Sequence, residues 1–322
     1  MKLLVTGGAG FIGSNFIHYW LAKHPTDEII NLDLLTYAGN LANLADIADQ
    51  PNYRFVQGDI VSDEVVDELV GQVDCIVNFA AETHVDRSIG NGLVFVKTNI
   101  EGTANLLEAA RRHGVRFHQV STDEVYGDLG PNDPKFNELS PYRPSSPYSA
   151  SKAAADHLVR AYYRTYNLPI TISNCSNNYG PYQYPEKIIP LFITNLIEDR
   201  KVPLYGQGSN IRDWIYVDDH NAGLEAILLH GRVGETYCLG GDHEISNLEL
   251  AKEIIQLLGK DESYIEFVTD RPGHDWRYSI DFHKAKEELG WEPQVDFISG
   301  LEATVRWYKE HEAWWRPLKI KI

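Results

Sequence analysis

Tyr148 and Lys152 are the first pair whose types and spacing could do chemistry. They stand four residues apart just after Pro147, so a helix beginning there places both on one face. A tyrosine hydroxyl has a pKa of about 10, too high for a base at neutral pH, but a nearby ammonium group favours the phenolate. The pair could therefore take the proton of an alcohol while hydride leaves the same carbon. The same spacing is also common in ordinary surface pairings, so its meaning depends on the surrounding motifs.

Two adjacent carboxylates, Asp123 and Glu124, follow Thr122 directly after a predicted strand. This is the carboxyl edge at which doubly wound sheets bind their ligands. Neighbouring carboxylates in a confined cleft push their pKa values apart, so that one can act as an acid and the other as a base. That division suits an elimination, in which one group takes a proton and the other protonates a departing hydroxyl. The alternative is a helix cap or a solvated acidic turn.

The segment Gly-Gly-Ala-Gly-Phe-Ile-Gly follows the first predicted strand and opens a helix, with Gly7, Gly10 and Gly13 three residues apart. Such glycines allow a tight turn and a close approach of the backbone to a pyrophosphate, which the helix N-terminus also favours. A lone glycine pattern is weak evidence, but a strand, this motif and a helix in succession predict a dinucleotide site. The alternative is a plain glycine-rich turn.

Acidic residues after the next two strands refine the choice of cofactor. Asp33 ends the second strand, where a carboxylate can accept hydrogen bonds from the adenosine ribose. No Arg or Lys occurs between Asp33 and Asn40 to hold a 2′-phosphate, so NAD is favoured over NADP. Asp59 could reach the adenine amine or simply close a turn. The small Ala80 and Ala81 would let the cofactor backbone pass close by.

These residues need a scaffold, and the first half of the chain alternates short apolar strands with amphipathic helices, which indicates parallel β-α-β units and a doubly wound, Rossmann-like parallel sheet. The predicted strands are Lys2–Thr6, Glu28–Asp33, Tyr53–Gln57, Cys75–Phe79, Arg116–Ser121 and Ile170–Ser173, and the predicted helices include Asn15–Lys23, Asp63–Leu69, Asn99–His113 and Ser149–Tyr166.

Beyond about Asn177 the pattern loosens, with repeated prolines and clustered aromatics. We expect an NAD-binding domain over 1–176, to which the chain returns around 211–237, and a smaller α/β C-terminal lobe over 177–322 that holds the substrate. Strand-like and helix-like pieces, Trp214–Val217 and His220–Leu229, lie in this part of the chain. Aromatic residues close to the C-terminus predict a packed terminal helix rather than a ligand cage: Trp307, Tyr308, Trp314 and Trp315.

The composition limits the partners. A formal net charge of −17 argues against nucleic acid or an anionic membrane, and requires that any phosphorylated ligand be held by locally concentrated donors. The three cysteines lack metal-ligand spacing, which predicts buried reduced thiols and no metal site. The start of the chain is too short and too broken by glycine for a signal peptide or membrane span, and no later stretch is long and apolar enough, so we expect a soluble, cytoplasmic protein.

Several motifs together carry a family resemblance. The glycine motif, the Tyr-x-x-x-Lys pair and Asn-Tyr-Gly-Pro look like the extended short-chain dehydrogenase/reductase superfamily. Within it, the sequence resembles the dTDP-glucose 4,6-dehydratases over almost its whole length, at residues 35–40 (Leu-Thr-Tyr-Ala-Gly-Asn), 80–88, 122–127, 175–182, 185–187, 212–214 and 270–275.

The resemblance implies deoxysugar biosynthesis by a hydro-lyase that uses NAD without consuming it. Tyr148 would deprotonate the sugar 4-hydroxyl as hydride leaves carbon 4, with Lys152 holding the cofactor ribose and tuning Tyr148. Glu124 would remove the carbon 5 proton and Asp123 would protonate the departing 6-hydroxyl, while Thr122 would hydrogen-bond the 4-hydroxyl. Hydride return to carbon 6 would convert dTDP-glucose into dTDP-4-keto-6-deoxyglucose.

The resemblance also places ligand contacts. Around NAD we expect Gly7, Gly10, Phe11, Ile12, Gly13, Asp33, Leu34, Thr36, Asp59, Ile60, Phe79, Ala80, Ala81, Thr98, Tyr148, Lys152 and Asn178. Around the nucleotide sugar we expect Thr83, Thr122, Asn177, Glu186, Lys187, Pro203, Tyr205, Arg212, Asn247, Arg271 and His274. Arg212 and Arg271 would clamp the diphosphate, for which guanidinium is suited; the alternative is pairing with Asp213 or Asp270 at the surface.

The sequence departs from the expected family pattern at a few positions, and alternative functions stay open. Asn174 stands where an Arg is expected, Thr83 where Ser is common, and Trp276 at a position expected to vary. Asn174 puts a supporting contact near the sugar or nucleotide in doubt. A UDP-glucose 4,6-dehydratase and a nucleotide-sugar 4-epimerase are the alternatives, although an epimerase needs no elimination acid and base; a catalytically silent NAD-binding protein is a third. The resemblance implies a homodimer through the helices Asn99–His113 and Ser149–Tyr166.

Overall fold

The largest element is a seven-stranded parallel sheet, which confirms the predicted doubly wound fold. The structure is a computed structural model that describes residues 1–270 and 273–320. The sheet has the strand order β10-β6-β5-β4-β1-β2-β3. Its strands are β1 (Lys2–Thr6), β2 (Glu28–Asp33), β3 (Tyr53–Gln57), β4 (Cys75–Asn78), β5 (Arg116–Thr122), β6 (Ile170–Cys175) and β10 (Thr236–Leu239). The first six lie where the hydrophobic pattern predicts them, whereas the short β10 is an additional strand.

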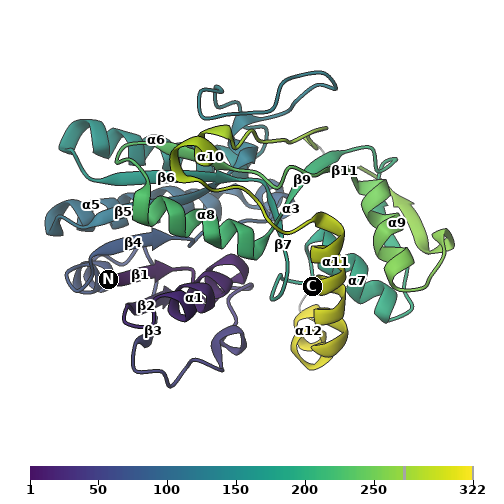
Figure 1. Ribbon diagram of the computed structural model, residues 1–322, viewed down its shortest axis with the longest axis horizontal. Helices are drawn as coiled ribbons and strands as arrows, with labels where there is room; N and C mark the ends of the chain where they lie inside the picture. The colour runs from purple at the N-terminus through teal and green to yellow at the C-terminus, as the bar shows by residue number, and fades with distance from the viewer. Residues whose placement is uncertain (271–272, 321–322) are drawn as a thin grey trace.

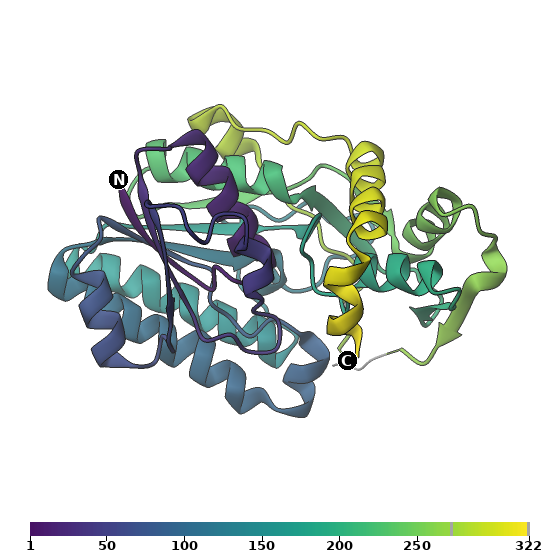
Figure 2. The ribbon, with the colours of Figure 1, turned by 90° about the horizontal axis from the view of Figure 1, so that it is seen from below.

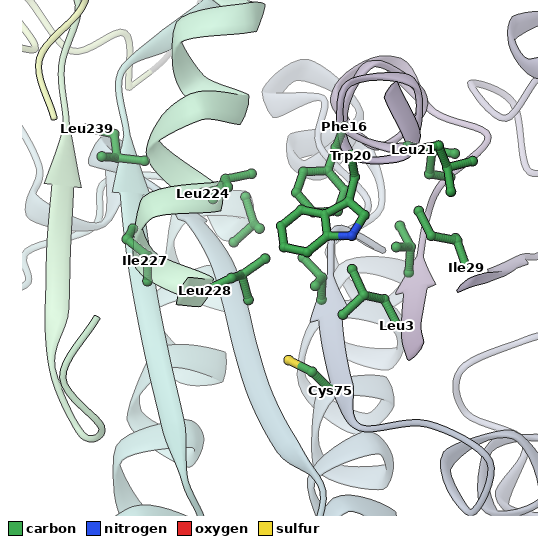
Figure 3. Close-up of a cluster of buried hydrophobic side chains, with 14 of the residues drawn as sticks. Leu3, Phe16, Trp20, Leu21, Ile29, Cys75, Leu224, Ile227, Leu228 and Leu239 are labelled. Atoms are coloured by element: carbon green, nitrogen blue, oxygen red, sulfur yellow. The ribbon is translucent and has the colours of Figure 1, made fainter. Parts of the chain in front are cut away.

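Helices cover both faces of this sheet (Figure 1, Figure 2). Successive strand residues point to opposite faces, so Leu3 and Val5 of β1 pack into one core and Leu4 into the other. The first core holds residues of α1 (Phe11–Lys23), α8 (Val217–His230) and α10 (His283–Leu289). Figure 3 shows Trp20 of α1 pointing toward Leu224 and Leu228 of α8. The opposite core holds residues of α2 (Asp63–Val70), α5 (Thr103–His113) and α6 (Pro147–Tyr166).

The predicted helix Asn99–His113 is only partly α-helical. A π-helical segment, η2 (Val96–Gly102), precedes α5, and the short helices α3 (Val85–Gly90) and α4 (Gly92–Phe95) come before it. By contrast, α6 ends at Tyr166 as predicted but begins at Pro147, before the predicted Ser149, because Ser146 and Ser149 form a reciprocal capping box and Pro147 occupies the first turn.

A second lobe lies at one end of the large sheet (Figure 1). It contains the three-stranded sheet β11-β9-β7 and the two-stranded sheet β12-β8. Its strands are β7 (Asn177–Tyr179), β8 (Val202–Tyr205), β9 (Ile211–Tyr216), β11 (Glu244–Ser246) and β12 (Ile265–Val268), and its helices are α7 (Ile188–Ile197), α9 (Asn247–Leu257), α11 (Phe297–Glu310) and α12 (Glu312–Lys319). Four short 3₁₀ or π segments complete the elements of the described ranges: η1 (Leu41–Leu44), η2, η3 (Asp123–Tyr126) and η4 (Glu262–Tyr264). After β9 the chain leaves this lobe and forms α8 and β10 at the large sheet. It does so again after β12, where it forms α10.

The C-terminal aromatics pack as predicted, although in two helices instead of one. Tyr308 of α11 and Trp315 of α12 are fully buried in the core of the second lobe. Trp314 donates its indole N–H to Asn43 Oδ1 at 2.8 Å, which fastens α12 to the loop region after β2.

Two general features of the described residues bear on function. None of the helices within 1–270 and 273–320 is long and apolar enough to span a membrane. Cys75, Cys175 and Cys238 are buried free thiols, as predicted.

Candidate functional site

One pocket collects the segments that follow six parallel strands at the carboxyl edge of the large sheet. This is the edge predicted to bind ligands, and the strand order reverses here between β1 and β4. The second lobe contributes one further wall. The lining residues are Gly7, Gly10, Phe11, Ile12, Gly13, Leu32, Asp33, Leu34, Thr36, Tyr37, Ala38, Gly39, Gly58, Asp59, Ile60, Phe79, Ala80, Ala81, Glu82, Thr83, Thr98, Val120, Ser121, Thr122, Asp123, Glu124, Tyr148, Lys152, Cys175, Ser176, Asn177, Asn178, Gln183, Tyr184, Glu186 and Lys187. All the predicted catalytic and NAD-contacting residues lie in it.

The glycine loop has a conformation that larger residues cannot adopt. Gly7 has a φ of +70°, and a Cβ there would lie 2.6 Å from Ala80 N. A Cβ on Gly13 would lie 2.5 Å from Gly7 O. Gly10 caps the N-terminus of α1, which leaves helix N–H groups facing the pocket. This cradle fits a pyrophosphate approached by backbone atoms.

Asp33 and Asp59 lie on the two neighbouring turns. The buried carboxylate of Asp33 accepts hydrogen bonds from Ala9 N at 2.9 Å and Leu35 N at 2.8 Å, while burial raises its pKa. Asp33 thus joins the glycine loop to the loop after β2, beside the position expected for a ribose. Asp59 Oδ1 accepts from Val61 N at 3.1 Å, so this residue both closes a turn and lines the pocket.

Several polar atoms in the pocket lack protein partners. Buried polar atoms are nearly always hydrogen-bonded, so such groups point to a polar ligand or to water. Within the described residues, these atoms are Tyr37 OH, Asp123 Oδ2, Ser176 Oγ, Asn177 Oδ1, Asn178 Oδ1, Gln183 Oε1 and Glu186 Oε1. Together with the glycine cradle, this donor and acceptor set fits a dinucleotide and a second polar ligand.

The two adjacent carboxylates lie in the pocket at the end of β5. Thr122 caps η3 by accepting from Glu124 N at 3.3 Å and donates its hydroxyl to Asp123 Oδ1 at 3.2 Å. Asp123 is 1% exposed. Burial, and next the charge of Glu124, raise its pKa well above the usual range. A carboxyl group whose pKa is raised in this way is suited to donate a proton to a leaving group.

Tyr148 and Lys152 line the same pocket from α6. Burial raises the pKa of Tyr148 well above its usual value, and the charges of Glu124 and Asp123 raise it further, while a hydrogen bond to Thr122 lowers it. This differs from the predicted lowering by Lys152, because full burial next to two carboxylates disfavours a phenolate. Lys152 itself donates to Val120 O at 2.8 Å, and burial lowers its pKa.

A hydrogen-bond network behind the pocket contains the departure at Asn174. Asn174 Nδ2 donates to Thr122 O at 3.1 Å, and its side-chain oxygen accepts from Tyr126 OH at 3.3 Å. The fully buried Asp156 accepts from Ser121 Oγ at 2.8 Å and from Tyr142 OH at 2.9 Å. Asn174 therefore supports the strand end that carries Thr122 and does not line the pocket.

The other departures have local roles. Thr83 lines the pocket, and its carbonyl accepts from Lys187 Nζ at 3.2 Å. Trp276 N donates to Asp128 Oδ1 at 2.6 Å, and its carbonyl accepts from Ile211 N at 2.7 Å, so its backbone joins the loop of Asp128 to the start of β9.

The expected substrate residues divide into two groups. Thr83, Thr122, Asn177, Glu186 and Lys187 line the pocket. Pro203, Tyr205, Arg212, Asn247 and His274 belong to the second lobe and are not among its lining residues. Arg271 lies outside the described residues.

Arg212 pairs neither with Asp213 nor with Asp270 in the structure. Its buried guanidinium donates to Ile211 O at 2.7 Å and to Asp275 O at 2.9 Å, and it stacks over Tyr278 at 4.3 Å from the ring centroid. The positive charge lies close enough to Asp123 to oppose the rise of that residue's pKa.

Tyr205 and His274 form an edge-to-face pair with centroids 6.0 Å apart. Tyr205 OH donates to Asp86 Oδ2 at 3.3 Å, so this pair of the second lobe contacts α3. His274 also lies 2.7 Å from Asp270.

Some pocket residues with polar or aromatic side chains were not among the predicted contacts: Tyr37, Glu82, Ser121, Ser176, Gln183 and Tyr184. Tyr37, Glu82 and Ser176 sit in segments that carry the family resemblance, which is the one signal that could have drawn attention to them, whereas Gln183 and Tyr184 lie between two such segments. Their chemical types alone give no such signal, because Tyr and Gln are common on ordinary surfaces.

Comparison with known proteins places the whole chain in one family. The family model described as GDP-mannose 4,6 dehydratase matches residues 4–304. A curated relative from Mycolicibacterium smegmatis, named dTDP-glucose 4,6-dehydratase, is 54% identical and aligns over 100% of this chain and 97% of its own length. A relative of the same name from Neisseria meningitidis is 50% identical over 98% of this chain and 95% of its own length.

Solved structures give the same result. The crystal structure of DesIV, a dTDP-glucose 4,6-dehydratase from Streptomyces venezuelae with NAD and TYD bound, has a TM-score of 0.97 and 52% identity and covers 99% of this chain and 100% of its own. A UDP-glucose 4-epimerase from Thermotoga maritima has a TM-score of 0.89 but 29% identity, over 96% of this chain and 99% of its own. The fold is thus common to dehydratases and epimerases, whereas the sequence identity is much higher with the dehydratases. This chain belongs to the dTDP-glucose 4,6-dehydratase family.

Proposed function

We propose that this chain binds NAD and dTDP-glucose in the described pocket and forms dTDP-4-keto-6-deoxyglucose and water. The observation that carries the proposal is the meeting of the Tyr148–Lys152 pair with Asp123 and Glu124 in one pocket that also contains the glycine cradle. The family supports the same reaction, since its named members with about half of their residues identical are dTDP-glucose 4,6-dehydratases.

In the first step Tyr148 takes the proton of the sugar 4-hydroxyl. Lys152, on the same face of α6, orients the cofactor ribose and supplies positive charge close to the tyrosine. Thr122 hydrogen-bonds the 4-hydroxyl and holds it toward Tyr148. Bound NAD supplies the hydride acceptor for carbon 4 and the hydride donor for carbon 6, and its positive charge favours the tyrosine phenolate.

In the second step the two carboxylates divide the elimination between them. The 4-keto group acidifies carbon 5, and Glu124 removes its proton. Asp123, whose pKa is raised by burial and by the charge of Glu124, gives its proton to the 6-hydroxyl, which leaves as water. When hydride reaches carbon 6, Glu124 returns a proton to carbon 5.

A nucleotide-sugar 4-epimerase is the closest rival, because it uses the same fold, NAD and the Tyr148–Lys152 pair. An epimerase needs no general acid and no general base for an elimination. The buried Asp123, with its raised pKa, therefore favours the dehydratase. For the same reason, a silent NAD-binding protein is disfavoured. Thymidine is favoured over uridine by the family alone.

The test uses Asp123→Asn and Glu124→Gln, which keep size and remove the ionisable group. General acid or base catalysis contributes ~100- to 10,000-fold, so dehydration falls by about that much in each variant, while NAD binding and some oxidation at carbon 4 persist. Glu124→Gln should also slow exchange of the carbon 5 hydrogen with solvent, and Asp123→Asn should affect that exchange less. Wild-type dehydration rates in both variants would refute the assignment. If Tyr148→Phe loses activity while Asp123→Asn and Glu124→Gln keep it, the epimerase becomes the favoured function.

We also propose that two different parts of the chain bind the cofactor and the nucleotide sugar. Residues 1–176, with the return of the chain as α8, β10 and α10, form the NAD-binding domain, and the remainder of 177–322 forms the nucleotide-sugar-binding lobe. The return predicted around 211–237 starts later than expected, because β9 pairs with β7 and β11 in the second lobe. Support comes from the pocket, whose glycine cradle belongs to the first part while Asn177, Glu186 and Lys187 belong to the second.

A homodimer through α6 and the η2–α5 run is the proposed assembly. The outer face of α6 carries the exposed or half-exposed apolar residues Ala150, Ala154, Leu158 and Ala161, and the neighbouring η2–α4 surface carries Leu93, Val96 and Ile100. Such a stripe suits helix packing with a second copy. Light scattering at micromolar concentration should give twice the 36.5 kDa chain mass, and a monomer would contradict the proposal.

We place the reaction in the cytoplasm. Three buried free thiols suit a reducing compartment, and the nucleotide sugar that the pocket is proposed to bind is a cytoplasmic type of metabolite.

A further inference from the structure

Arg87 joins two walls of the pocket from the outside. Its guanidinium lies 3.8 Å from the centroid of the Tyr37 ring, and its Nη2 donates to Glu186 Oε2 at 3.1 Å. Tyr37 belongs to the loop that follows β2, and Glu186 belongs to the segment before α7 in the second lobe. Both line the pocket, whereas Arg87 itself does not.

The contacts around this triad are those of a built structure and not of a chance surface pair. The Glu186 side chain is only 6% exposed, so its carboxylate is largely removed from water and depends on its protein partners. His84 lies 3.9 Å from the same carboxylate, but burial lowers the pKa of His84 to about 4, so this imidazole is uncharged at neutral pH. Arg87 therefore supplies positive charge at the Glu186 carboxylate.

Tyr37 is fixed from its other side as well. Its ring meets Tyr184 edge to face, with centroids 5.5 Å apart and an interplanar angle of 83°. The loop that carries Tyr37 starts at Asp33, which bonds the glycine cradle through Ala9 N. A movement of Tyr37 away from Arg87 would therefore loosen the wall next to the proposed cofactor site.

We propose that Arg87, Tyr37 and Glu186 form a clasp that keeps the cofactor in the pocket throughout the catalytic cycle. The inference rests on the proposed function, because a hydride taken from carbon 4 must be returned in the same site. If the reduced cofactor left midway, the sugar would be stranded as a 4-keto compound. Arg87 is a positioning residue in this account, since it acts through the two walls that it joins.

The test measures how fast NAD leaves the purified full-length protein in the absence of sugar. NAD is loaded, the protein is mixed with a large excess of differently labelled NAD, and the retained original NAD is quantified over time after denaturation. Cation–π contacts and partly buried ion pairs together contribute enough that Arg87→Ala should speed NAD loss about 10- to 100-fold. Arg87→Lys keeps the charge but loses the planar stacking, so it should give a smaller acceleration.

A matched control is Arg232→Ala, which removes an exposed arginine paired with Glu288 just before β10, at the opposite edge of the sheet. It should leave NAD loss unchanged. The clasp is refuted if Arg87→Ala loses NAD within about twofold of the wild-type rate, or if the control accelerates it equally. Should Arg87→Ala not fold, wild-type retention in Arg87→Lys refutes the stacking part of the clasp.

Different results would contradict the proposed function and the proposed clasp. A wild-type protein that holds NAD tightly but does not dehydrate dTDP-glucose contradicts the proposed function and leaves the retention measurement valid. A wild-type protein that dehydrates while Arg87→Ala retains NAD normally contradicts the clasp alone. A wild-type protein that binds no NAD contradicts both.

Discussion

Gly13 shows how strictly single positions in this pocket are constrained. A Cβ at Gly13 would lie 2.5 Å from Gly7 O and 2.8 Å from Gly8 Cα, and neither backbone atom can move without opening the turn. A Cβ at Gly90, at the end of α3, would meet nothing within 4 Å, so this position serves as a control.

Gly13→Ala should therefore lower the free energy of unfolding by about 1 to 3 kcal/mol through overpacking, and should reduce the NAD content of the purified protein. Gly90→Ala should stay within about 0.5 kcal/mol of wild type with normal NAD content. Thermal unfolding and quantification of released NAD check both. Equal behaviour of the two variants would show that the cradle has more room than its geometry allows.

Residue types and spacing were enough to predict Gly7, Asp33 and Tyr148, because the chemistry of each requires a particular neighbour along the chain. Tyr37 could not be found in this way. Its environment is made by Arg87 and Glu186, which are distant in sequence and meet it only in the fold. The same limit applies to the pKa of Tyr148, which burial raises although the neighbouring Lys152 predicts a lower value.

At the scale of elements, the π-helical segment η2 positions two parts of the pocket. Its Asn99 exchanges hydrogen bonds with the backbone of Glu82, at 2.9 Å and 3.0 Å, and donates to Ser151 Oγ at 2.8 Å. These bonds link η2, the loop after β4 and α6. Thr98, one residue earlier, lines the pocket.

Asn99→Ala should lower the free energy of unfolding by about 2 to 4 kcal/mol, since it removes three hydrogen bonds and leaves buried partners unsatisfied. Asn105→Ala, on the following helix, removes the side-chain hydrogen bond to Ile60 O and should cost about 1 kcal/mol. Urea denaturation of both variants makes the comparison. If the Asn99 variant is no less stable than the Asn105 variant, η2 does not hold these segments together.

Short, sharply bounded apolar runs predicted the strands of the large sheet well, because β1, β2, β4, β5 and β6 are almost entirely buried, whereas the edge strand β3 is only partly buried. The hydrophobic pattern could not predict η2, since a π turn leaves nearly the same apolar pattern as an α turn. Asn99 of η2 bonds to Glu82 and Ser151, and such tertiary contacts are contained in no local pattern.

For the whole molecule, two buried histidines predict how stability depends on pH. Burial lowers the pKa of both His118 and His220 to about 3, from an ordinary value of 6.5. Both are therefore neutral in the folded state, whereas the unfolded chain binds protons below pH 6.5. Their contribution is present above that pH and is lost as the pH falls from about 6.5 toward about 3.

His220→Met should remove one such titration. Between about pH 7 and about pH 4.5, the loss of unfolding free energy should be roughly 2 to 3 kcal/mol smaller in this variant than in wild type. His283→Met changes a side chain that is 74% exposed and should leave the loss unchanged. Chemical denaturation at both pH values checks this, and an unchanged pH dependence in His220→Met would contradict it. Burial raises the pKa of Asp213 to about 6, so protonation of this residue stabilises the folded state as the pH falls. This opposite contribution is the same in wild type and in both variants.

The arrangement of the second lobe was the part least accessible from sequence. Its strands are short and come from five separate stretches, and β9 pairs with both β7 and β11. The family resemblance predicts Tyr205, Arg212 and His274 as substrate contacts, and none of them is among the residues that line the pocket. The contact of Tyr205 with α3 depends on how the lobe meets the large sheet, and the bond of Arg212 to Asp275 O joins segments far apart in the sequence.

The central claim is that one pocket oxidises carbon 4, eliminates water and returns the same hydride to carbon 6. The most direct measurement uses dTDP-glucose carrying deuterium at carbon 4, incubated with the NAD-loaded protein and an excess of free unlabelled NADH. The account predicts that the deuterium appears in the carbon 6 methyl group of the 4-keto product, with none in the free cofactor. Deuterium in the free NADH, or a product methyl group without deuterium, would contradict it.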